Sequence, residues 1–245
     1  MAVKIPFRRE LTFKYGQVDT VAPGVRRVIA NNPSPFTLHG TGTYIIGQGN
    51  VAVIDPGPAD ATHIANLLAA IPGETISHVL VTHTHMDHSP GCALLRQHSD
   101  APTYGFGPHG AGKIAMGIDV EEGGDMEFAP DHKVVHGQII DGDGWSIECV
   151  YTPGHTSNHL CFQLRSSRSL FTGDHVMGWS TSIISPPMVT WLPTWTVCAC
   201  CSIATTVSTG QPTGQPSSSQ NHMSRRLSPA ARSDRRRSSN ACGKA

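Results

Sequence analysis

The sequence predicts an α/β domain built of layers, because apolar runs of strand length alternate with a segment of helical periodicity. Strand-like runs of four to seven residues recur between residues 43 and 172, and most of them end at glycine, proline or a polar cluster. Between two of these runs, apolar residues repeat at the spacing of a helix. Alternating strands and helices pack as sheets covered by helices, so we expect a layered α/β fold.

The first predicted elements are a hairpin and a helix. The hairpin spans residues 36–55, with strands at 43–46 and 51–54 joined by a glycine-rich turn. The helix follows because Ile64, Leu67, Leu68 and Ile71 share one face before Pro72-Gly73 ends it. The other predicted elements are a buried strand at 78–81, a helix at 90–98, a glycine-rich loop at 105–124, and strands at 145–151, 160–164 and 169–172.

Charge is balanced over the whole chain, with 18 Lys+Arg and 18 Asp+Glu, but not along it. Residues 188–245 hold seven basic residues and one acid, so by subtraction residues 1–187 hold 11 basic and 17 acidic residues. The acidic part also holds 13 of the 14 histidines. This composition favours a cation-binding enzyme over a nucleic-acid surface.

The cysteines and the length of the apolar segments indicate in which cellular compartment the protein is expected. Three of the seven cysteines are scattered over residues 1–187 and four fall in residues 188–245, which predicts free thiols in a reducing environment rather than a disulfide framework. The sequence shows no apolar core of signal-peptide length near its beginning and no window of membrane-spanning length. We therefore expect a cytoplasmic protein with no membrane association, whose oligomeric state the sequence does not define.

The most informative segment is Thr82-His83-Thr84-His85-Met86-Asp87-His88, which directly follows the strand at 78–81. Side chains two apart on a strand end point the same way, so His83 and His85 can meet at one cation, while Asp87 and His88 can face a second position after the chain turns. These ligand types suit zinc, iron or manganese better than calcium, and the lack of cysteine favours an open catalytic site. Four such groups within six residues disfavour the alternative of ordinary core or surface histidines.

The segment at 83–88 matches the H-x-H-x-D-H motif of the metallo-β-lactamase superfamily, and three further landmarks resemble that family in the same order. They are Val53-Ile54-Asp55-Pro56-Gly57, Thr152-Pro153-Gly154-His155-Thr156 and Leu170-Phe171-Thr172-Gly173-Asp174. About residues 20–187 are therefore similar to this family. The resemblance implies a four-layer αββα sandwich, of which the C-terminal part is expected to be missing here.

The resemblance also implies a centre for two zinc ions, with iron or manganese as alternatives. Two cations close together would provide a hydroxide at neutral pH, so no side-chain nucleophile would be needed. The implied ligands are His83, His85 and His155 on one cation, Asp87 and His88 on the other, and Asp174 between the two.

Other residues are implied to act around these ligands. Asp55 would support them from behind, and Asp87 would also take part in catalysis by orienting the hydroxide or taking up a proton. His159 is a candidate for contact with the substrate, with a plain structural role as its alternative. His109, in the glycine-rich loop, is a weaker candidate for lining the substrate cleft.

After Ser185-Pro186-Pro187 the family pattern stops. The family continues with helices, a last strand and one more histidine for the second cation, whereas His222 is the only histidine here and its context does not match. Regrouping the codons of residues 188–201 by one base permits Asp-Gly-Asp-Met followed by an amphipathic helix, and regrouping residues 208–216 permits Tyr-Arg-Pro-Ala-His-Gly. Two such matches in order favour a frameshift near codon 188, which the coding DNA can test.

We therefore predict two regions: an incomplete hydrolase domain over residues 1–187 and a disordered, unrelated tail over residues 188–245. A basic arm that binds nucleic acid is the alternative for the tail, because it contains arginine pairs and triplets but no amphipathic pattern.

The predicted function is hydrolysis of an ester, thioester, lactam or phosphodiester by a metal-activated hydroxide. A small-molecule substrate is expected, with RNA as an alternative. The chain resembles the small cytoplasmic branch of β-lactamase-like 2 proteins and general hydrolases more than it resembles glyoxalase II. In glyoxalase II the metal motif usually continues with His-x-Gly-Gly, and this chain has Ser89-Pro90-Gly91 at that place. The rival hypothesis is a catalytically impaired or inactive frameshifted relic that binds one metal or none.

Overall fold

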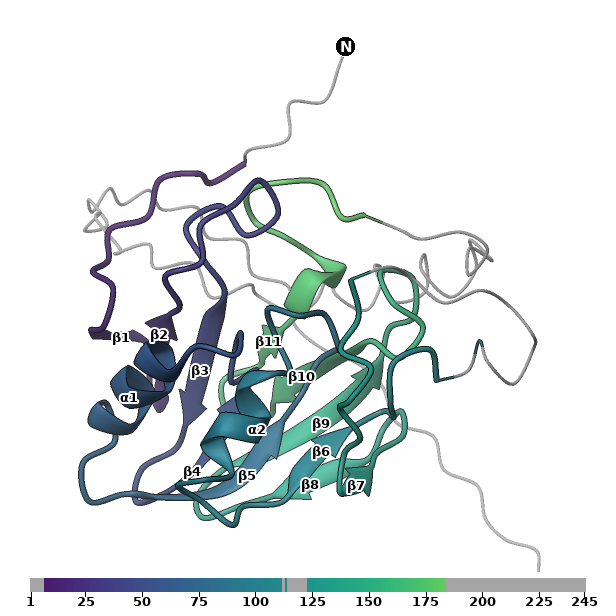
Figure 1. Ribbon diagram of the computed structural model, residues 1–245. Helices are drawn as coiled ribbons and strands as arrows, with labels where there is room; N and C mark the ends of the chain where they lie inside the picture. Colours follow the sequence, from purple (N-terminus) through teal and green to yellow (C-terminus); the bar gives the residue numbers. More distant parts are fainter. Residues whose placement is uncertain (1–6, 112, 114–122, 184–245) are drawn as a thin grey trace, which may run out of the picture. The chain divides into compact units, whose positions relative to one another are not determined.

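Two β-sheets form the framework of this computed structural model, which describes residues 7–111, 113 and 123–183 (Figure 1). The first sheet has the strand order β1-β2-β3-β4-β5-β6-β7, and the second has the order β11-β10-β9-β8. The first sheet contains β1 (Val18–Ala22), β2 (Val25–Ile29), β3 (Gly42–Ile46), β4 (Asn50–Ile54), β5 (Thr75–Leu80), β6 (Thr103–Gly105) and β7 (His132–Lys133). The second contains β8 (Ile139–Asp141), β9 (Ser146–Tyr151), β10 (Leu160–Leu164) and β11 (Ser169–Phe171).

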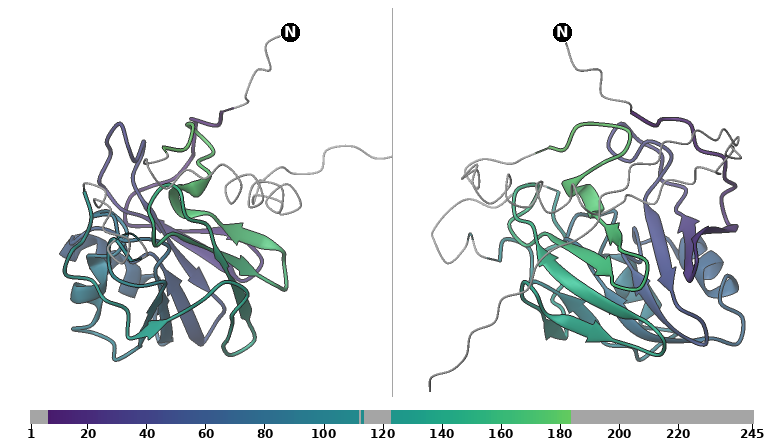
Figure 2. Two further views of the ribbon diagram at one scale, coloured as in Figure 1. Left: turned by 90° about the vertical axis from the view of Figure 1, so that its right-hand side faces the viewer. Right: turned by 180° about the vertical axis from the view of Figure 1, so that it is seen from behind.

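The two helices cover one face of the first sheet. α1 (Ala61–Ala69) connects β4 to β5, which are parallel, and α2 (Gly91–Leu95) lies between β5 and β6. Asp60 begins α1 by accepting a hydrogen bond from the Thr62 amide, as an N-cap residue does. Figure 2 shows the helices on one side of the first sheet and the second sheet on the other.

Alternation along the strands separates the two apolar layers. On β3, Ile45 packs with Leu67 of α1, whereas its neighbour Ile46 packs in the cluster between the sheets. On β4, Val53 packs in the layer beneath the helices and Ile54 packs in the cluster between the sheets. Because successive side chains of a strand point to opposite faces, the first sheet is apolar on both of them.

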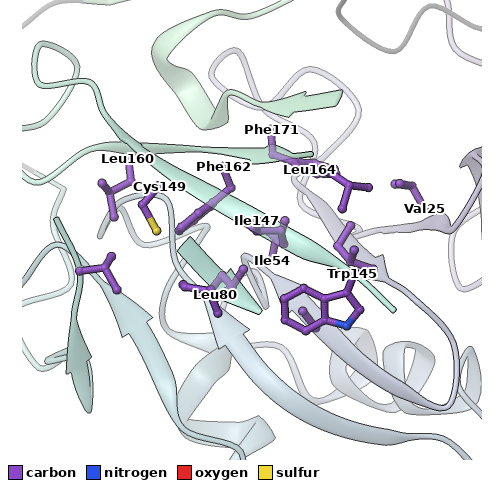
Figure 3. Packing of buried hydrophobic residues seen from close by; sticks show 14 residues of the cluster. Val25, Ile54, Leu80, Trp145, Ile147, Cys149, Leu160, Phe162, Leu164 and Phe171 are labelled. Atoms are coloured by element: carbon purple, nitrogen blue, oxygen red, sulfur yellow. The ribbon is translucent and has the colours of Figure 1, made fainter. Parts of the chain in front are cut away.

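The core between the sheets is centred on β10 (Figure 3). Phe162 is fully buried there, among side chains that include Ile54 and Leu80 of the first sheet and Ile147 of the second. Antiparallel pairing of β10 with both β9 and β11 fixes which of its residues face inward.

Replacing Phe162 by alanine is expected to lower the free energy of unfolding by about 3–5 kcal/mol, because the change removes a buried ring and leaves a cavity. Phe36, which is 71% exposed, provides the matched control, and its alanine variant is expected to differ from the wild type by less than about 0.5 kcal/mol. Urea unfolding of both variants measures the difference. Equal stabilities would contradict the placement of Phe162.

His63 of α1 gives the fold a dependence on pH. Burial lowers the pKa of His63 below 6.5, while Asp60 acts in the opposite direction. The unfolded chain therefore takes up a proton first as the pH falls, so this contribution to stability is complete above pH 6.5 and is lost progressively below it.

We expect the metal-free protein to unfold at lower urea concentration at pH 5.5 than at pH 7.5, and His63→Gln to reduce that difference. The control is His98→Gln, because the His98 side chain is exposed. An identical pH dependence in His63→Gln and the wild type would rule out this contribution.

Most elements match the sequence-based predictions. The layered α/β class is confirmed, as are the hairpin of β3 and β4, both helices, and the strands β5, β9, β10 and β11. Strands β1, β2, β6, β7 and β8 were not predicted. Among the described residues neither helix is long and apolar enough to cross a membrane.

The described residues supply three of the four expected layers, namely the helices and the two sheets. The predicted end of the domain at Pro187 and the predicted tail at 188–245 lie outside the described ranges. The domain boundary and the frameshift therefore stay predictions.

Candidate metal centre

The four sequence motifs meet because each of them follows the end of a strand. β4 leads into Asp55 and β5 leads into the segment 82–88, both on the first sheet. β9 leads toward His155, and β11 leads into the short helix η2 (Gly173–His175), which contains Asp174; both belong to the second sheet. Predicted ligands from the two sheets therefore converge at one edge of the sandwich.

Three imidazole nitrogens lie together at this edge. His85 Nδ1 is 3.2 Å from His83 Nε2 and 3.0 Å from His155 Nε2. Together with a carboxylate oxygen of Asp174, these atoms all lie within 4.8 Å of one another. Nitrogens bound tetrahedrally to one zinc ion are about 3.3 Å apart, given zinc–nitrogen bonds of about 2.0–2.1 Å. The spacing therefore suits a single cation.

The hydrogen atoms around these rings support the same conclusion. His155 Nδ1 lies 2.9 Å from the carbonyl oxygen of Ile183 and must donate to it, which leaves His155 Nε2 bare in the neutral ring. His83 Nδ1 faces the Thr82 hydroxyl at 3.0 Å, and that hydroxyl donates its hydrogen to Asp55, so His83 Nε2 is bare as well.

His85 Nδ1 lies beside the lone pairs of His83 Nε2 and His155 Nε2 and has at most one hydrogen to donate to them. At least one pair of nitrogens therefore meets without a proton between them, which is unfavourable for buried groups. A cation at their centre satisfies all three. The donor set thus fits zinc, and equally fits other divalent cations that accept imidazole ligands.

The electrostatics keep the rings of His83 and His85 neutral, as ligands must be. Burial lowers the pKa of His83 well below 6.5, and the neighbouring rings of His88 and His159 act in the same direction. Burial, reinforced by His155, lowers the pKa of His85 to about 4. Neither ring competes with a cation by taking up a proton at neutral pH.

Asp174 lies between two groups of potential ligands. Its Oδ2 is 3.4 Å from His155 Nε2 and 3.9 Å from His83 Nε2, whereas its Oδ1 is 3.6 Å from His88 Nε2. The two oxygens therefore face two different positions. Asp87 completes the second position, since its Oδ2 lies 3.2 Å from His88 Nε2.

Negative charge collects at this second position. Burial would lower the pKa of His88, but Asp87, Asp174 and Asp55 raise it well above 6.5. Burial would raise the pKa of Asp87, but the charge and the hydrogen bond of His88, with a 2.6 Å hydrogen bond from Thr41, lower it to about 2. Several carboxylates around one ring form an environment that attracts a cation.

Asp55, the residue expected to support the ligands, lies in contact with Thr82 and His88. Its carboxylate accepts hydrogen bonds of 2.7 Å from the amide and from the hydroxyl of Thr82, and it lies 2.9 Å from His88 Nδ1. The other ring nitrogen of His88 points toward Asp87 and Asp174. A partner on the far side of a ligand ring sets its orientation and tautomer.

His159 lies behind the centre. Its side chain is fully buried, its ring stacks on His83 with centroids 4.9 Å apart, and its Nδ1 lies 2.8 Å from the Thr152 hydroxyl. A Cβ atom on Gly173 would come within 2.8 Å of His159 Nε2, so the ring also packs closely against the loop that contains Asp174. This position favours the structural alternative over the candidate contact with substrate.

His109 is also buried, and it was the weaker candidate for the cleft. Its Nδ1 lies 2.8 Å from the Thr84 hydroxyl, which in turn accepts a hydrogen bond from Asn158. Asn158 also donates to the carbonyl oxygens of Gly107 and Pro108. These bonds tie the start of the glycine-rich loop to the metal motif.

Sequence reasoning missed several of the groups that position the ligands. Thr41, Thr82 and the carbonyl oxygen of Ile183 each contact a predicted ligand or its support. Threonines and carbonyl groups are common along the chain, so only Thr82 had a sequence signal, namely its place directly before the first ligand.

Comparison with known proteins identifies the family of this fold and site. The profile of the metallo-β-lactamase superfamily matches residues 37–233, and the chain belongs to this superfamily of hydrolases. The matched range continues past Pro187, while the narrower branch expected from the sequence stays a prediction.

Curated relatives include an atrochrysone carboxyl ACP thioesterase of Cryptosporiopsis sp. (strain 8999), which is 35% identical over 71% of this chain and 50% of its own length. A lactamase-like protein of Pestalotiopsis microspora is 32% identical over 71% of this chain and 51% of its own length. The chain thus spans about half the length of these curated relatives.

Solved structures show the same fold. A β-lactamase domain protein from Burkholderia ambifaria has a TM-score of 0.57 at 19% identity and covers 72% of this chain and 59% of its own. A metallo-β-lactamase family protein from Thermus thermophilus has a TM-score of 0.54 at 17% identity, covering 72% of this chain and 67% of its own. At these identities the likeness concerns the fold alone.

Proposed function

We propose that this chain is a hydrolase that depends on two divalent cations, zinc in the first instance. The observation on which this rests is the convergence of three imidazole nitrogens from both sheets beside Asp174, whose two oxygens face separate positions. His83, His85 and His155 would hold one cation, and Asp87 and His88 the other, with Asp174 between them. The bound cations would supply a nucleophile at neutral pH and stabilise negative charge on the substrate oxygen.

The residues of the chain would contribute orientation and charge. Asp87 is ionised at neutral pH, with its pKa lowered to about 2, so it can accept a hydrogen bond from the attacking water and orient it. Thr41 holds the same carboxylate through its 2.6 Å hydrogen bond. Asp55 keeps His88 turned toward the centre.

Among the four bond types expected from the sequence, we favour a thioester, because curated relatives at 33–36% identity include proteins named as carboxyl ACP thioesterases. A thioester carbonyl offers the charge development that such a centre stabilises, and its thiolate is a good leaving group. We therefore propose an acyl thioester of a small molecule as the substrate class.

The test uses the protein stripped with a chelator and then reloaded with zinc. We expect the reloaded protein to hydrolyse an acyl thioester of N-acetylcysteamine faster than the matched oxygen ester or a lactam, and the stripped protein to be inactive. Equal rates with and without zinc would refute the metal-dependent mechanism. Faster turnover of the oxygen ester would refute the thioester preference alone.

The relic remains a second candidate because of the second cation position. Within residues 7–111, 113 and 123–183, the groups that face this position are Asp87, His88 and Asp174, which give it a single histidine. Zinc analysis separates the candidates. About two bound equivalents with turnover support the hydrolase, whereas one equivalent or less without turnover supports the relic.

A further inference from the structure

A buried carboxylate serves both cation positions at once. Thr82 has one hydroxyl hydrogen and donates it to Asp55 Oδ2, so its oxygen accepts from His83 Nδ1. The same Asp55 oxygen lies 2.9 Å from His88 Nδ1. Asp55 therefore sets the ring of His83 through Thr82 and the ring of His88 directly, and each of these rings faces a different cation position.

The backbone of Asp55 is unusual in a way that needs support. Its φ angle is 51°, in the left-handed region that residues with side chains seldom adopt, and only two other described non-glycine residues share this feature. Such a conformation is unfavourable by itself and persists where surrounding contacts enforce it. It also directs the carboxylate toward Thr82 and His88, so those contacts bear on the metal centre.

One such contact comes from Thr43 on β3. Its buried hydroxyl donates a 2.6 Å hydrogen bond to the Asp55 carbonyl oxygen, while the Asp55 amide donates to the Leu80 carbonyl oxygen at 2.9 Å. Both hydrogen-bonding groups of the Asp55 backbone are thereby held by neighbouring strands of the first sheet.

His63 on α1 fixes the direction of that hydroxyl. His63 Nε2 lies 2.8 Å from Thr43 Oγ1, and because the hydroxyl hydrogen is used toward Asp55, the ring must be the donor. His63 also packs against the turn after Asp55, where a Cβ on Gly57 would come within 3.0 Å of the ring. Its Nδ1 is buried with no hydrogen-bond partner among the described residues, which is costly for a purely structural side chain.

We propose that Thr43 and His63 are positioning residues of the metal centre: their hydrogen-bonded pair holds Asp55 in its left-handed conformation, and Asp55 orients one histidine for each cation. This inference rests on the two-cation centre proposed above. It connects the helix layer to the site through His63, Thr43, Asp55 and then Thr82 or His88.

Thr43→Val removes the hydroxyl while keeping the shape of the side chain. We expect it to weaken zinc binding by about tenfold to a hundredfold, the effect usual for lost partners of ligand residues. Thr43→Ser keeps the hydroxyl and is expected to bind zinc as the wild type does. His63→Phe is expected to behave like Thr43→Val, and His63→Gln, which keeps an N–H donor, is expected to restore part of the affinity.

A matched control separates positioning from general destabilisation. Thr103 is a similarly buried threonine whose hydroxyl donates to Asp131, which is not among the proposed ligands, so Thr103→Val removes a comparable hydrogen bond elsewhere. Zinc affinity is measured by competition with a chromogenic chelator, the ligand field by the absorption spectrum of the cobalt-loaded protein, and stability by unfolding of the metal-free protein. Weaker zinc binding and an altered cobalt spectrum in Thr43→Val, but not in Thr103→Val, would support the proposal.

Unchanged zinc affinity in a folded Thr43→Val would overturn the positioning role and leave the proposed function intact. If that variant does not fold, the comparison of His63→Phe with His63→Gln decides, and equal zinc affinities in those two would overturn the proposal. A wild-type chain that binds no zinc would refute the metal centre itself, and the inference with it.

Discussion

Replacing His83 by alanine is expected to abolish zinc-dependent hydrolysis, with turnover falling by at least about a thousandfold. His83 provides one of the three converging nitrogens, and its ring lies against four other imidazole rings, those of His85, His88, His155 and His159. The change therefore removes a ligand and opens a gap behind the two rings that remain. The first zinc equivalent is expected to be lost with the activity.

The measurement combines the zinc content of the purified variant with its rate on the thioester that the wild type hydrolyses. His98→Ala is the control, because His98 is exposed and is not one of the proposed ligands. Wild-type turnover in the His83 variant would refute the assignment of the first cation position. A variant that loses turnover but keeps all of its zinc would place His83 in another role.

Replacing Asp174 by asparagine is expected to have the second largest effect. The change keeps the shape of the side chain but removes the charge whose two oxygens face His155 and His88. Burial would raise the pKa of Asp174, yet His88, His155 and His83 hold it well below its usual range, so the wild-type group is a carboxylate at any working pH. We expect one zinc equivalent to remain at His83, His85 and His155, with turnover lower by about a hundredfold or more.

Asp100→Asn is a suitable control, since Asp100 is exposed and is not one of the proposed ligands. Zinc titration followed by rate measurements on both variants gives the comparison. Two equivalents of zinc in Asp174→Asn would show that this carboxylate does not join the two positions. Unchanged turnover with one equivalent would show that hydrolysis needs only the first cation.

The central part of the fold could be predicted because its pattern is local. The apolar run that ends at Ile46, the glycine turn after it and the next apolar run define a hairpin, and apolar spacing defines α1. Strand β7 has only two residues, both exposed, so it offers no apolar pattern to detect. Strand β1 has no fully buried residue and lies at one edge of its sheet, and β6 has three residues, which leaves pairing with neighbours as the main determinant of both.

The proposed ligands and Asp55 could be inferred because their order along the chain reproduces a family pattern, but the residues that hold Asp55 could not. Thr43 and His63 lie twenty residues apart and meet Asp55 only after β3, β4 and α1 have packed. His159 shows the same limitation from the other direction. Its closeness to His155 in sequence left a substrate contact and a structural role open, and only the packed structure, where its ring is enclosed behind His83, favours the structural role.

The distribution of the proposed ligands over both sheets has a mechanical consequence. His83, His85 and His88 follow β5 of the first sheet, while His155 and Asp174 follow β9 and β11 of the second. A cation held by both groups would act as a crosslink between the sheets, and unfolding would have to break it. At free zinc a thousandfold above the dissociation constant, such binding stabilises the folded state by about 4 kcal/mol. Zinc supply would then govern how much of the chain stays folded, as well as how fast it works.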